Sequence, residues 1–300
     1  MTTQNSTALH IAEEVRDALA GNRPVVALES TILSHGLPAP RNHAVGVRLE
    51  EVVRAAGAVP ATIAVLDGVP HIGLSESQLD RVCTEDLLKL SKRDLGAAYA
   101  LHRSGATTVA STTALAHAAG IRVFGTGGLG GVHRGASETW DVSADLDVVA
   151  VTPVLVVCSG VKSILDIGAT LEVMETRSVP VVGYQVDKFP AFYRRESEFD
   201  VPWRVDDAKQ AAAVFAASNS GMLLANPIPH AFEMAQELHD RLLAEGLEKL
   251  RQGNVHGKDV TPVLLEHFHT GSGGVSLAAN EALVVNNVQL AAEVAVELSR

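Results

Sequence analysis

Hydrophobic and polar positions follow two alternating periods along most of the chain. Apolar residues at helical spacing predict helices over residues 8–20, 44–56, 144–151, 164–176 and a segment ending at 217. Short apolar runs between them, typical of buried strands, predict strands over 24–28, 107–110, 121–124, 154–157, 181–184 and 222–225. This alternation of helix and strand signals predicts an α/β/α arrangement around a sheet.

One hairpin signal makes the predicted sheet a mixed one. Asp67-Gly68 joins the apolar runs 62–66 and 69–72, and this dipeptide favours a two-residue turn between antiparallel strands. Composition does not break anywhere along the chain. We therefore expect a single domain over residues 1–300.

Several helix ends carry their own signals. Ser75 with Gln78 three residues later predicts a capping box, and Asp94 can cap the next helix, which runs to about residue 103. Ser143 can cap the helix 144–151, which places Asp145 in its first turn. The last third of the chain is predicted to be mostly helical, with amphipathic spacing over 232–250 and 276–298.

Composition and charge exclude several classes of protein. The chain has 300 residues, 47% of them hydrophobic, and its 24 basic and 35 acidic residues give a net charge of −11. This acidic balance does not favour binding to nucleic acid or to an anionic membrane. Cys83 and Cys158 are too few for a disulfide framework, and no segment has the pattern of a signal peptide or a membrane span. We expect a cytoplasmic protein.

A glycine-rich segment is the main candidate for chemistry. Five glycines lie between Gly125 and Gly131, where they can let the backbone turn tightly and direct N–H groups at an anion. Residues 125–130 match G-x-G-x-x-G, but no helix signal follows, so a dinucleotide fingerprint is rejected. The later Gly160-Val161-Lys162-Ser163 is not a P-loop, because Leu155 stands where that motif needs its first glycine.

Charged groups follow this segment closely. Asp141 and Asp145 lie between the glycines and Lys162, and Lys162 follows the predicted strand 154–157 by a few residues. Hydroxyl groups at 111–113, at the expected start of a helix that stops at Gly120, offer a second anion contact. Together these residues suggest a small phosphorylated substrate that is handled by acid–base or amine chemistry.

At this point the chain resembles a known family, the pseudouridine-5'-phosphate glycosidases, also called the indigoidine synthase A-like family. The resemblance covers nearly the whole chain and is carried by several long polar motifs, which are ALEST (27–31), SHG (34–36), SKRD (91–94), GATTVAST (105–112), GGLGGVHRG (127–135), DVSADL (141–146), VKSILD (161–166), ANPIP (225–229) and NN (286–287). It implies a three-layer α/β/α sandwich with a mixed, largely parallel sheet. It also implies a homotrimer and cleavage of pseudouridine 5'-phosphate to uracil and ribose 5-phosphate.

The resemblance also assigns roles to individual residues. It implies that Glu29 is the proton donor, that Lys162 is the covalent nucleophile, and that Asp141 binds one divalent ion, usually Mn²⁺, in each subunit. The positions implied to contact substrate are Lys89, Val109, Ser143, Ala144 and Asp145. Two further candidates are His133, for phosphate or uracil, and Asn280, for ribose, although the segment around Asn280 departs from the family's pattern.

The chemistry explains why a lysine is needed. The bond to uracil C5 is carbon–carbon, so it has no leaving oxygen whose lone pair a carboxylic acid could protonate. A lysine imine of open-chain ribose 5-phosphate is an electrophile that uracil C5 can attack, and cleavage is the reverse of that addition.

Other interpretations of these residues stay open. Lys162 could be a surface lysine at a helix start, Glu29 could cap a turn, and Asp145 could serve the helix dipole. His133 could make only a structural hydrogen bond. The chain could also be another sugar-phosphate lyase, a carbohydrate kinase-like enzyme or a non-catalytic nucleotide-binding scaffold, because α/β sheets carry many functions.

Overall fold

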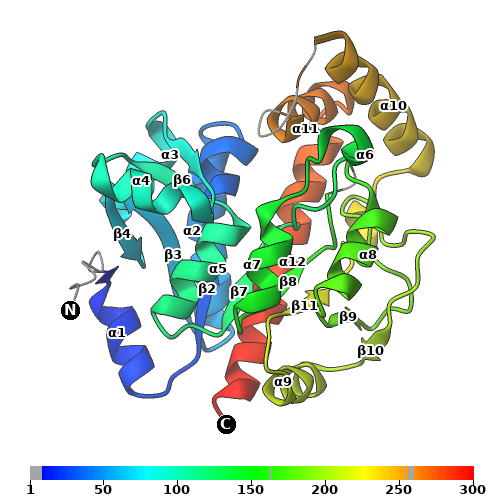
Figure 1. The fold of residues 1–300 in the computed structure, drawn as a ribbon. Helices are drawn as coiled ribbons and strands as arrows, with labels where there is room; N and C mark the ends of the chain where they lie inside the picture. Colours follow the sequence, from blue (N-terminus) through cyan, green and yellow to red (C-terminus); the bar gives the residue numbers. More distant parts are fainter. Residues whose placement is uncertain (1–8, 163, 254, 256–259) are drawn as a thin grey trace.

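A mixed sheet forms the centre of the molecule, with helices on both of its faces (Figure 1). The computed structural model describes residues 9–162, 164–253, 255 and 260–300. Within these ranges the strands are β1 (His10–Ile11), β2 (Val25–Leu28), β3 (Val59–Leu66), β4 (Val69–Ile72), β5 (Leu88–Leu90), β6 (Gly105–Thr107), β7 (Val123–Gly125), β8 (Leu155–Cys158), β9 (Val181–Tyr184), β10 (Trp203–Val205) and β11 (Met222–Ala225). Their main order is β1-β4-β3-β2-β7-β8-β11-β9-β10, with β6 beside β3 and β5 beside β6.

Parallel pairing dominates this sheet, as the sequence predicts. Only β3–β4 and β3–β6 pair antiparallel among the described strands. In β2, β8 and β11 every residue is buried, because a strand in the middle of a parallel sheet is covered by helices on both faces. The predicted α/β fold with a mixed, mostly parallel sheet is confirmed.

Helices cover the two faces of the sheet. Their bounds are α1 (Glu13–Ala20), α2 (Arg41–Ala55), α3 (Glu76–Thr84), α4 (Leu95–Ala100), α5 (Val109–Ala118), α6 (Ala136–Thr139), α7 (Ala144–Val151), α8 (Ile167–Thr176), α9 (Ala208–Ala217), α10 (Gln236–Gly253), α11 (Val260–Gly271) and α12 (Val275–Leu298). In Figure 1, α5, α7 and α8 lie in front of the strands, while α12 lies behind them and packs on β2, β7 and β8. None of the helices in the described ranges is both long enough and apolar enough to cross a membrane.

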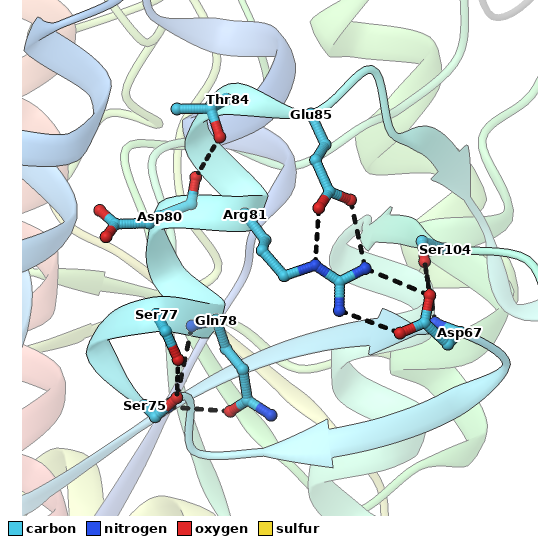
Figure 2. Close-up of polar contacts among 9 residues, drawn as sticks. All are labelled: Asp67, Ser75, Ser77, Gln78, Asp80, Arg81, Thr84, Glu85 and Ser104. Carbon is cyan, nitrogen blue, oxygen red and sulfur yellow. Dashed lines mark hydrogen bonds and ion pairs between the residues drawn. The ribbon is translucent and has the colours of Figure 1, made fainter.

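The predicted hairpin and capping box are both present (Figure 2). Asp67 and Gly68 have φ values of +52° and +80°, as a turn that needs left-handed residues at both central positions requires. Arg81 of α3 donates to both carboxylate oxygens of Asp67, at 2.9 and 3.1 Å, and so ties the hairpin turn to the neighbouring helix. Ser75 accepts from the backbone N–H of Gln78, whose side chain accepts in return from the N–H of Ser75.

Some predicted elements are wrong or shifted. The predicted strand 107–110 is a strand only up to Thr107, and α5 already begins at Val109. The hydroxyl groups at 111–113 lie in the first turns of this helix, as predicted, but they are fully buried, and Ser111 donates to the carbonyl of Leu90 at 2.6 Å. Asp94 does not cap the following helix, because its carboxylate accepts from the N–H of Ser91 at 2.9 Å instead. The predicted helix 164–176 begins later, at Ile167, where Asp166 caps it.

Other elements were not predicted. Residues 260–271, which lie between the two predicted amphipathic segments, form α11, and the long loop after β2 contains a π-helical turn, η1 (Ile32–Gly36). The described residues also form two short 3₁₀ turns, η2 (Lys92–Asp94) and η3 (His230–Phe232). Ala8 of the first predicted helix and Ser163 of the VKSILD motif lie outside the described residues.

Candidate active site

The candidate residues meet at the carboxyl ends of three neighbouring parallel strands. Glu29 directly follows β2, Thr126 directly follows β7, and Lys162 lies four residues beyond β8. Because β2, β7 and β8 are adjacent and parallel, the segments that follow them lie at one edge of the sheet. In open α/β sheets this edge is where ligands usually bind.

Glu29 is held by a neighbour from the next strand. Its Oε1 accepts a hydrogen bond from the hydroxyl of Thr126. Burial raises the pKa of the Glu29 carboxyl, while the positive charge of Lys162 and the Thr126 hydrogen bond oppose that rise. A raised pKa keeps more of this carboxyl protonated at a given pH, which suits a proton donor.

The backbone fixes Lys162 next to the glycine segment. The N–H of Lys162 donates to the carbonyl of Leu129 at 3.2 Å, and the N–H of Leu129 donates to the carbonyl of Gly160 at 3.0 Å. Leu129 and Val161 thus continue the parallel pairing of β7 with β8 beyond the strands themselves. This pairing directs Lys162 to the same cleft as Glu29.

Two adjoining hollows meet at these residues, and Glu29, Thr31, Lys89 and Lys162 line both of them. The first encloses about 480 Å³ and is largely apolar; its other lining residues are Ile32, His35, Gly36, Gly127, Gly128, Phe192, Pro262, Leu265 and Asn280. The second encloses about 1020 Å³ and is more polar; its other lining residues are Ser91, Arg93, Thr108, Val109, Gly130, His133, Asp141, Val142, Ser143, Ala144, Asp145 and Leu165. Every catalytic, substrate-binding or metal-binding residue predicted from the sequence lines one hollow or both.

The glycine segment serves a different purpose from the one expected. None of its five glycines has a left-handed φ, so the segment does not need glycine for a tight turn. The glycines instead allow close packing. A Cβ on Gly128 would lie 2.6 Å from the ring of Phe192, and a Cβ on Gly130 would lie 2.7 Å from Oδ2 of Asp145.

The carboxylate of Asp145 accepts hydrogen bonds from backbone N–H groups that were expected to bind an anion. Its Oδ2 accepts from the N–H of Gly130 at 3.0 Å, and its Oδ1 accepts from the N–H of Ala110 at 2.8 Å. Ser143 caps α7 by accepting from the N–H of Asp145 at 3.2 Å, as predicted. The carboxylate of Asp145 thereby joins the glycine segment, the start of α5 and the start of α7.

Asp141 and His133 lie together at the rim of the polar hollow. The Nδ1 of His133 is 3.6 Å from Oδ2 of Asp141, and the backbone N–H of His133 donates to the carbonyl of Asp141 at 3.0 Å. Burial lowers the pKa of His133, an effect that Asp141 opposes and that Lys162 and Lys89 reinforce. No cluster of three or more His, Cys, Asp or Glu side chains that could bind a metal occurs among the described residues.

The remaining predicted residues divide between the two hollows. Val109 is the first residue of α5, and Lys89 lies in the short strand β5; both face the polar hollow together with Ser143 and Ala144. Asn280 of α12 faces the apolar hollow, where it is 97% buried (3% exposed), and its Oδ1 has no hydrogen-bond partner among the described residues.

Three residues that shape the site were not predicted from the sequence. Thr126 positions Glu29, Phe192 forms a wall of the apolar hollow, and His35 lines that hollow with a buried Nε2 that has no partner among the described residues. His35 lies in the π-helical turn, a distortion that is frequent at functional sites. Two signals in the sequence could have found it: its place in a polar loop after a buried strand and its place in the SHG motif.

Comparisons with known proteins agree on one family. The family model described as indigoidine synthase A like protein matches residues 14–297 of the chain. A pseudouridine-5'-phosphate glycosidase from Salinispora tropica is 53% identical over 299 residues, which cover 97% of this chain and 92% of that protein.

Two solved structures share the fold over nearly the whole chain. A prealnumycin C-glycosynthase in complex with ribulose 5-phosphate has a TM-score of 0.90 and 38% identity, and the match covers 98% of each chain. An indigoidine synthase A-like protein from Thermotoga maritima has a TM-score of 0.90 and 34% identity, with 100% of this chain and 99% of that chain covered.

Proposed function

The chain belongs to the indigoidine synthase A-like family, and from this premise we propose that it cleaves the carbon–carbon glycosidic bond of pseudouridine 5'-phosphate, giving uracil and ribose 5-phosphate. Relatives that are 51 to 53% identical over nearly the whole chain are named pseudouridine-5'-phosphate glycosidases, which supports this substrate. The reaction is reversible, so the same site also serves synthesis.

One observation carries the proposal: Glu29 and Lys162 lie where an apolar hollow joins a polar one. Pseudouridine 5'-phosphate has the same division, because a flat base is bonded directly to a hydroxylated, phosphorylated sugar. With uracil between Ile32 and Phe192 and the ribose phosphate in the polar hollow, the bond to be broken lies beside both reactive groups. Apolar walls with a few placed polar groups are typical of small-molecule sites.

Lys162 would act as the covalent nucleophile. Its amine adds to the sugar carbon C1′, and the bond from C1′ to the ring oxygen breaks. Uracil C5 then takes a proton, the electrons of the C1′–C5 bond restore the C5=C6 double bond, and the lone pair of the lysine nitrogen forms the imine. Water hydrolyses the imine and releases ribose 5-phosphate.

Glu29 would move the protons. The ring oxygen needs a proton when its bond to C1′ breaks, and uracil C5 needs one before the carbon–carbon bond can break. Glu29 is close to the proposed nucleophile, because the charge of Lys162 acts on its carboxyl, and Thr126 holds that carboxyl in place. Burial raises the pKa of that carboxyl, which makes its protonated form more available as a proton donor.

The polar hollow would hold the phosphate. Lys89 and Arg93 supply positive charge there, and α5 begins at Val109 on the same wall. The first turn of a helix favours an anion, because its N–H groups point outward. Phosphate binding far from the broken bond would orient the open-chain sugar at Lys162.

The residues at the rim of the polar hollow fit one Mn²⁺ ion held mainly by Asp141. Mg²⁺-like ions are commonly bound by one or two carboxylates together with water and substrate phosphate, so a single carboxylate suffices. His133, kept neutral by its lowered pKa, can add a nitrogen ligand. When bound, the ion would offset phosphate charge and polarise an oxygen of the substrate.

Uracil release tests the proposal. Purified protein with pseudouridine 5'-phosphate and Mn²⁺ should give uracil and ribose 5-phosphate in equal amounts, while unphosphorylated pseudouridine should react far more slowly. Equal turnover of both substrates would contradict the phosphate site. Absence of uracil, or consumption of ATP with a sugar as acceptor, would contradict the function and favour another sugar-phosphate enzyme.

A further inference from the structure

Asn287 is a fully buried amide behind the candidate site. It lies in the middle of α12, the helix that packs on β2, β7 and β8. Its Nδ2 donates to the carbonyl of Thr126 at 2.8 Å and to the carbonyl of Gly127 at 3.2 Å. The same nitrogen is 3.0 Å from the hydroxyl of Ser159. One side chain therefore contacts the segments that follow both β7 and β8.

The oxygen of the amide extends this contact to a third strand end. Oδ1 accepts from Nδ2 of Asn226, which directly follows β11, at 3.0 Å, and lies 3.3 Å from the hydroxyl of Ser159. Both ends of the Asn287 amide are thus satisfied by groups from outside its own helix. A fully satisfied buried polar network favours one arrangement of the segments it joins.

Two of these segments hold the reactive groups of the proposed reaction in place. Thr126 donates its hydroxyl to Glu29, while Ser159 begins the segment that leads to Lys162. The N–H of Ser159 also donates to the carbonyl of Gly127 at 3.0 Å, directly beside the amide. A shift of either segment would change the distance between Glu29 and Lys162.

We infer that Asn287 is a positioning residue that sets the placement of Glu29 against Lys162 by holding the Thr126–Gly127 and Ser159 backbones in register. The inference rests on the proposed function. Asn287 lies behind both segments and lines neither hollow, so it acts through Thr126 and Ser159.

Its neighbour Asn286 provides a matched control. Asn286 is the same residue type on the same helix, and its only side-chain hydrogen bond among the described residues runs from Nδ2 to the carbonyl of Pro227 at 3.2 Å. Asn286→Ala removes one partly buried hydrogen bond without touching the segments of Thr126 or Ser159. It should lower the melting temperature and leave kcat close to the wild-type value.

The test compares Asn287→Leu, which keeps the size of the side chain, with Asn286→Ala and wild type. We expect Asn287→Leu to lower kcat for uracil release about 10²-fold, as small misplacements of reacting groups do, with KM changed far less. Trapping of ribose 5-phosphate on Lys162 by borohydride should slow in parallel.

The pH profile separates positioning from stability. In a plot of kcat against pH, the limb that is present in wild type and absent in Glu29→Gln reports the titration of Glu29. The hydrogen bond from the Thr126 hydroxyl lowers the pKa of this carboxyl. If Asn287→Leu displaces Thr126, this limb moves to higher pH. A variant that is merely less stable would keep the limb where it is.

A milder variant keeps the test valid if Asn287→Leu does not fold. Ser159→Ala removes only the hydroxyl that joins Asn287 to the β8 segment, and it should change kcat and the limb in the same direction by less. Wild-type kcat and an unmoved limb in every folded variant, with only the melting temperature lowered, would overturn the inference. A wild-type protein that releases no uracil would instead overturn the proposed function.

Discussion

The carboxylate of Asp145 accepts a hydrogen bond from the backbone N–H of Gly130 at 3.0 Å, while its other oxygen accepts from Ala110. Asp145→Asn keeps the shape of the side chain but leaves one acceptor oxygen, so its NH₂ group faces a backbone N–H. We expect a loss of about 1–3 kcal/mol in the free energy of unfolding, because a buried donor loses its partner. Chemical denaturation at neutral pH measures the loss.

Substrate binding to the same variant separates two roles of Asp145. If the carboxylate mainly joins the glycine segment to α5 and α7, stability and turnover fall together. Wild-type stability combined with weak binding of ribose 5-phosphate would show that Asp145 mainly contacts the substrate, as the resemblance implies. Ser143→Ala, which loses the cap of α7 but keeps Asp145, is the matched control.

Glu29→Gln tests the proton donor. The variant keeps the shape of the side chain but cannot exchange protons, and loss of a general acid or base typically lowers the rate about 10²–10⁴-fold. Binding of ribose 5-phosphate, followed by calorimetry, should persist. Normal uracil release by this variant would make Glu29 a turn residue, and the donor would then be sought in Asp145 or His133.

The same substitution has an effect on stability with a definite sign. Because the pKa of Glu29 is raised in the folded protein, the folded state binds more protons than the unfolded state between the ordinary and the raised pKa. This contribution to the stability of the wild type is therefore fully present below the ordinary pKa and is lost as pH rises through that interval. Glu29→Gln, which resembles the protonated acid, should melt at a higher temperature than wild type at pH above the interval.

Melting curves at acidic and neutral pH measure this difference. The stabilisation by Glu29→Gln should be present at pH above the raised pKa of Glu29 and should vanish once the wild-type carboxyl is protonated in both states. A difference that is the same at every pH, or a variant that is less stable throughout, would contradict a destabilising charge at Glu29.

Local signals predicted the parts of the fold that depend on neighbours in sequence. Asp67-Gly68 specified its hairpin because both residues accept left-handed φ values, and Ser143 specified the start of α7 through its own side chain. The segment 107–110 failed for the opposite reason. Thr108 and Val109 favour strands, but the N–H of Ala110 finds its acceptor in Asp145, thirty-five residues away, so the chain turns into α5 there.

The candidate site divides in the same way. Glu29 and Lys162 could be predicted because each follows a buried strand and lies in a motif that resembles the family. Their distance from one another, and the role of Asn287, depend on hydrogen bonds between residues more than a hundred positions apart. The sequence marked the glycine segment as important, but the expected reason, a tight turn, was wrong. Gly128 and Gly130 are needed because a Cβ there would collide with Phe192 and Asp145.

Asp141→Ala tests the metal site. If Asp141 is the main ligand of Mn²⁺, the variant should need far more Mn²⁺ for half-maximal activity, and its affinity measured by titration calorimetry with the metal alone should fall as well. Asp147→Ala, an exposed carboxylate on α7 that pairs with Arg177, is the matched control. Full activity of the wild type after exhaustive chelation, or unchanged Mn²⁺ affinity in Asp141→Ala, would contradict the assignment.

Lys162→Arg tests the nucleophile itself. Arginine keeps the positive charge that acts on Glu29, but its guanidinium stays protonated up to about pH 12 and cannot form an imine. We expect uracil release to stop while ribose 5-phosphate still binds. Wild-type protein incubated with ribose 5-phosphate and borohydride should gain one reduced sugar phosphate per chain, and peptide mapping should locate it at Lys162.

Lys188→Arg controls for the loss of any lysine, because Lys188 forms a surface ion pair with Asp200 at 2.7 Å away from both hollows. This variant should trap the sugar phosphate as wild type does, since its imine-forming lysine is intact. An adduct at Lys89 or Lys92 in wild type would transfer the role of nucleophile to that residue. Cleavage without any trapped adduct would contradict an imine altogether, because reduction by borohydride captures an imine that accumulates during turnover.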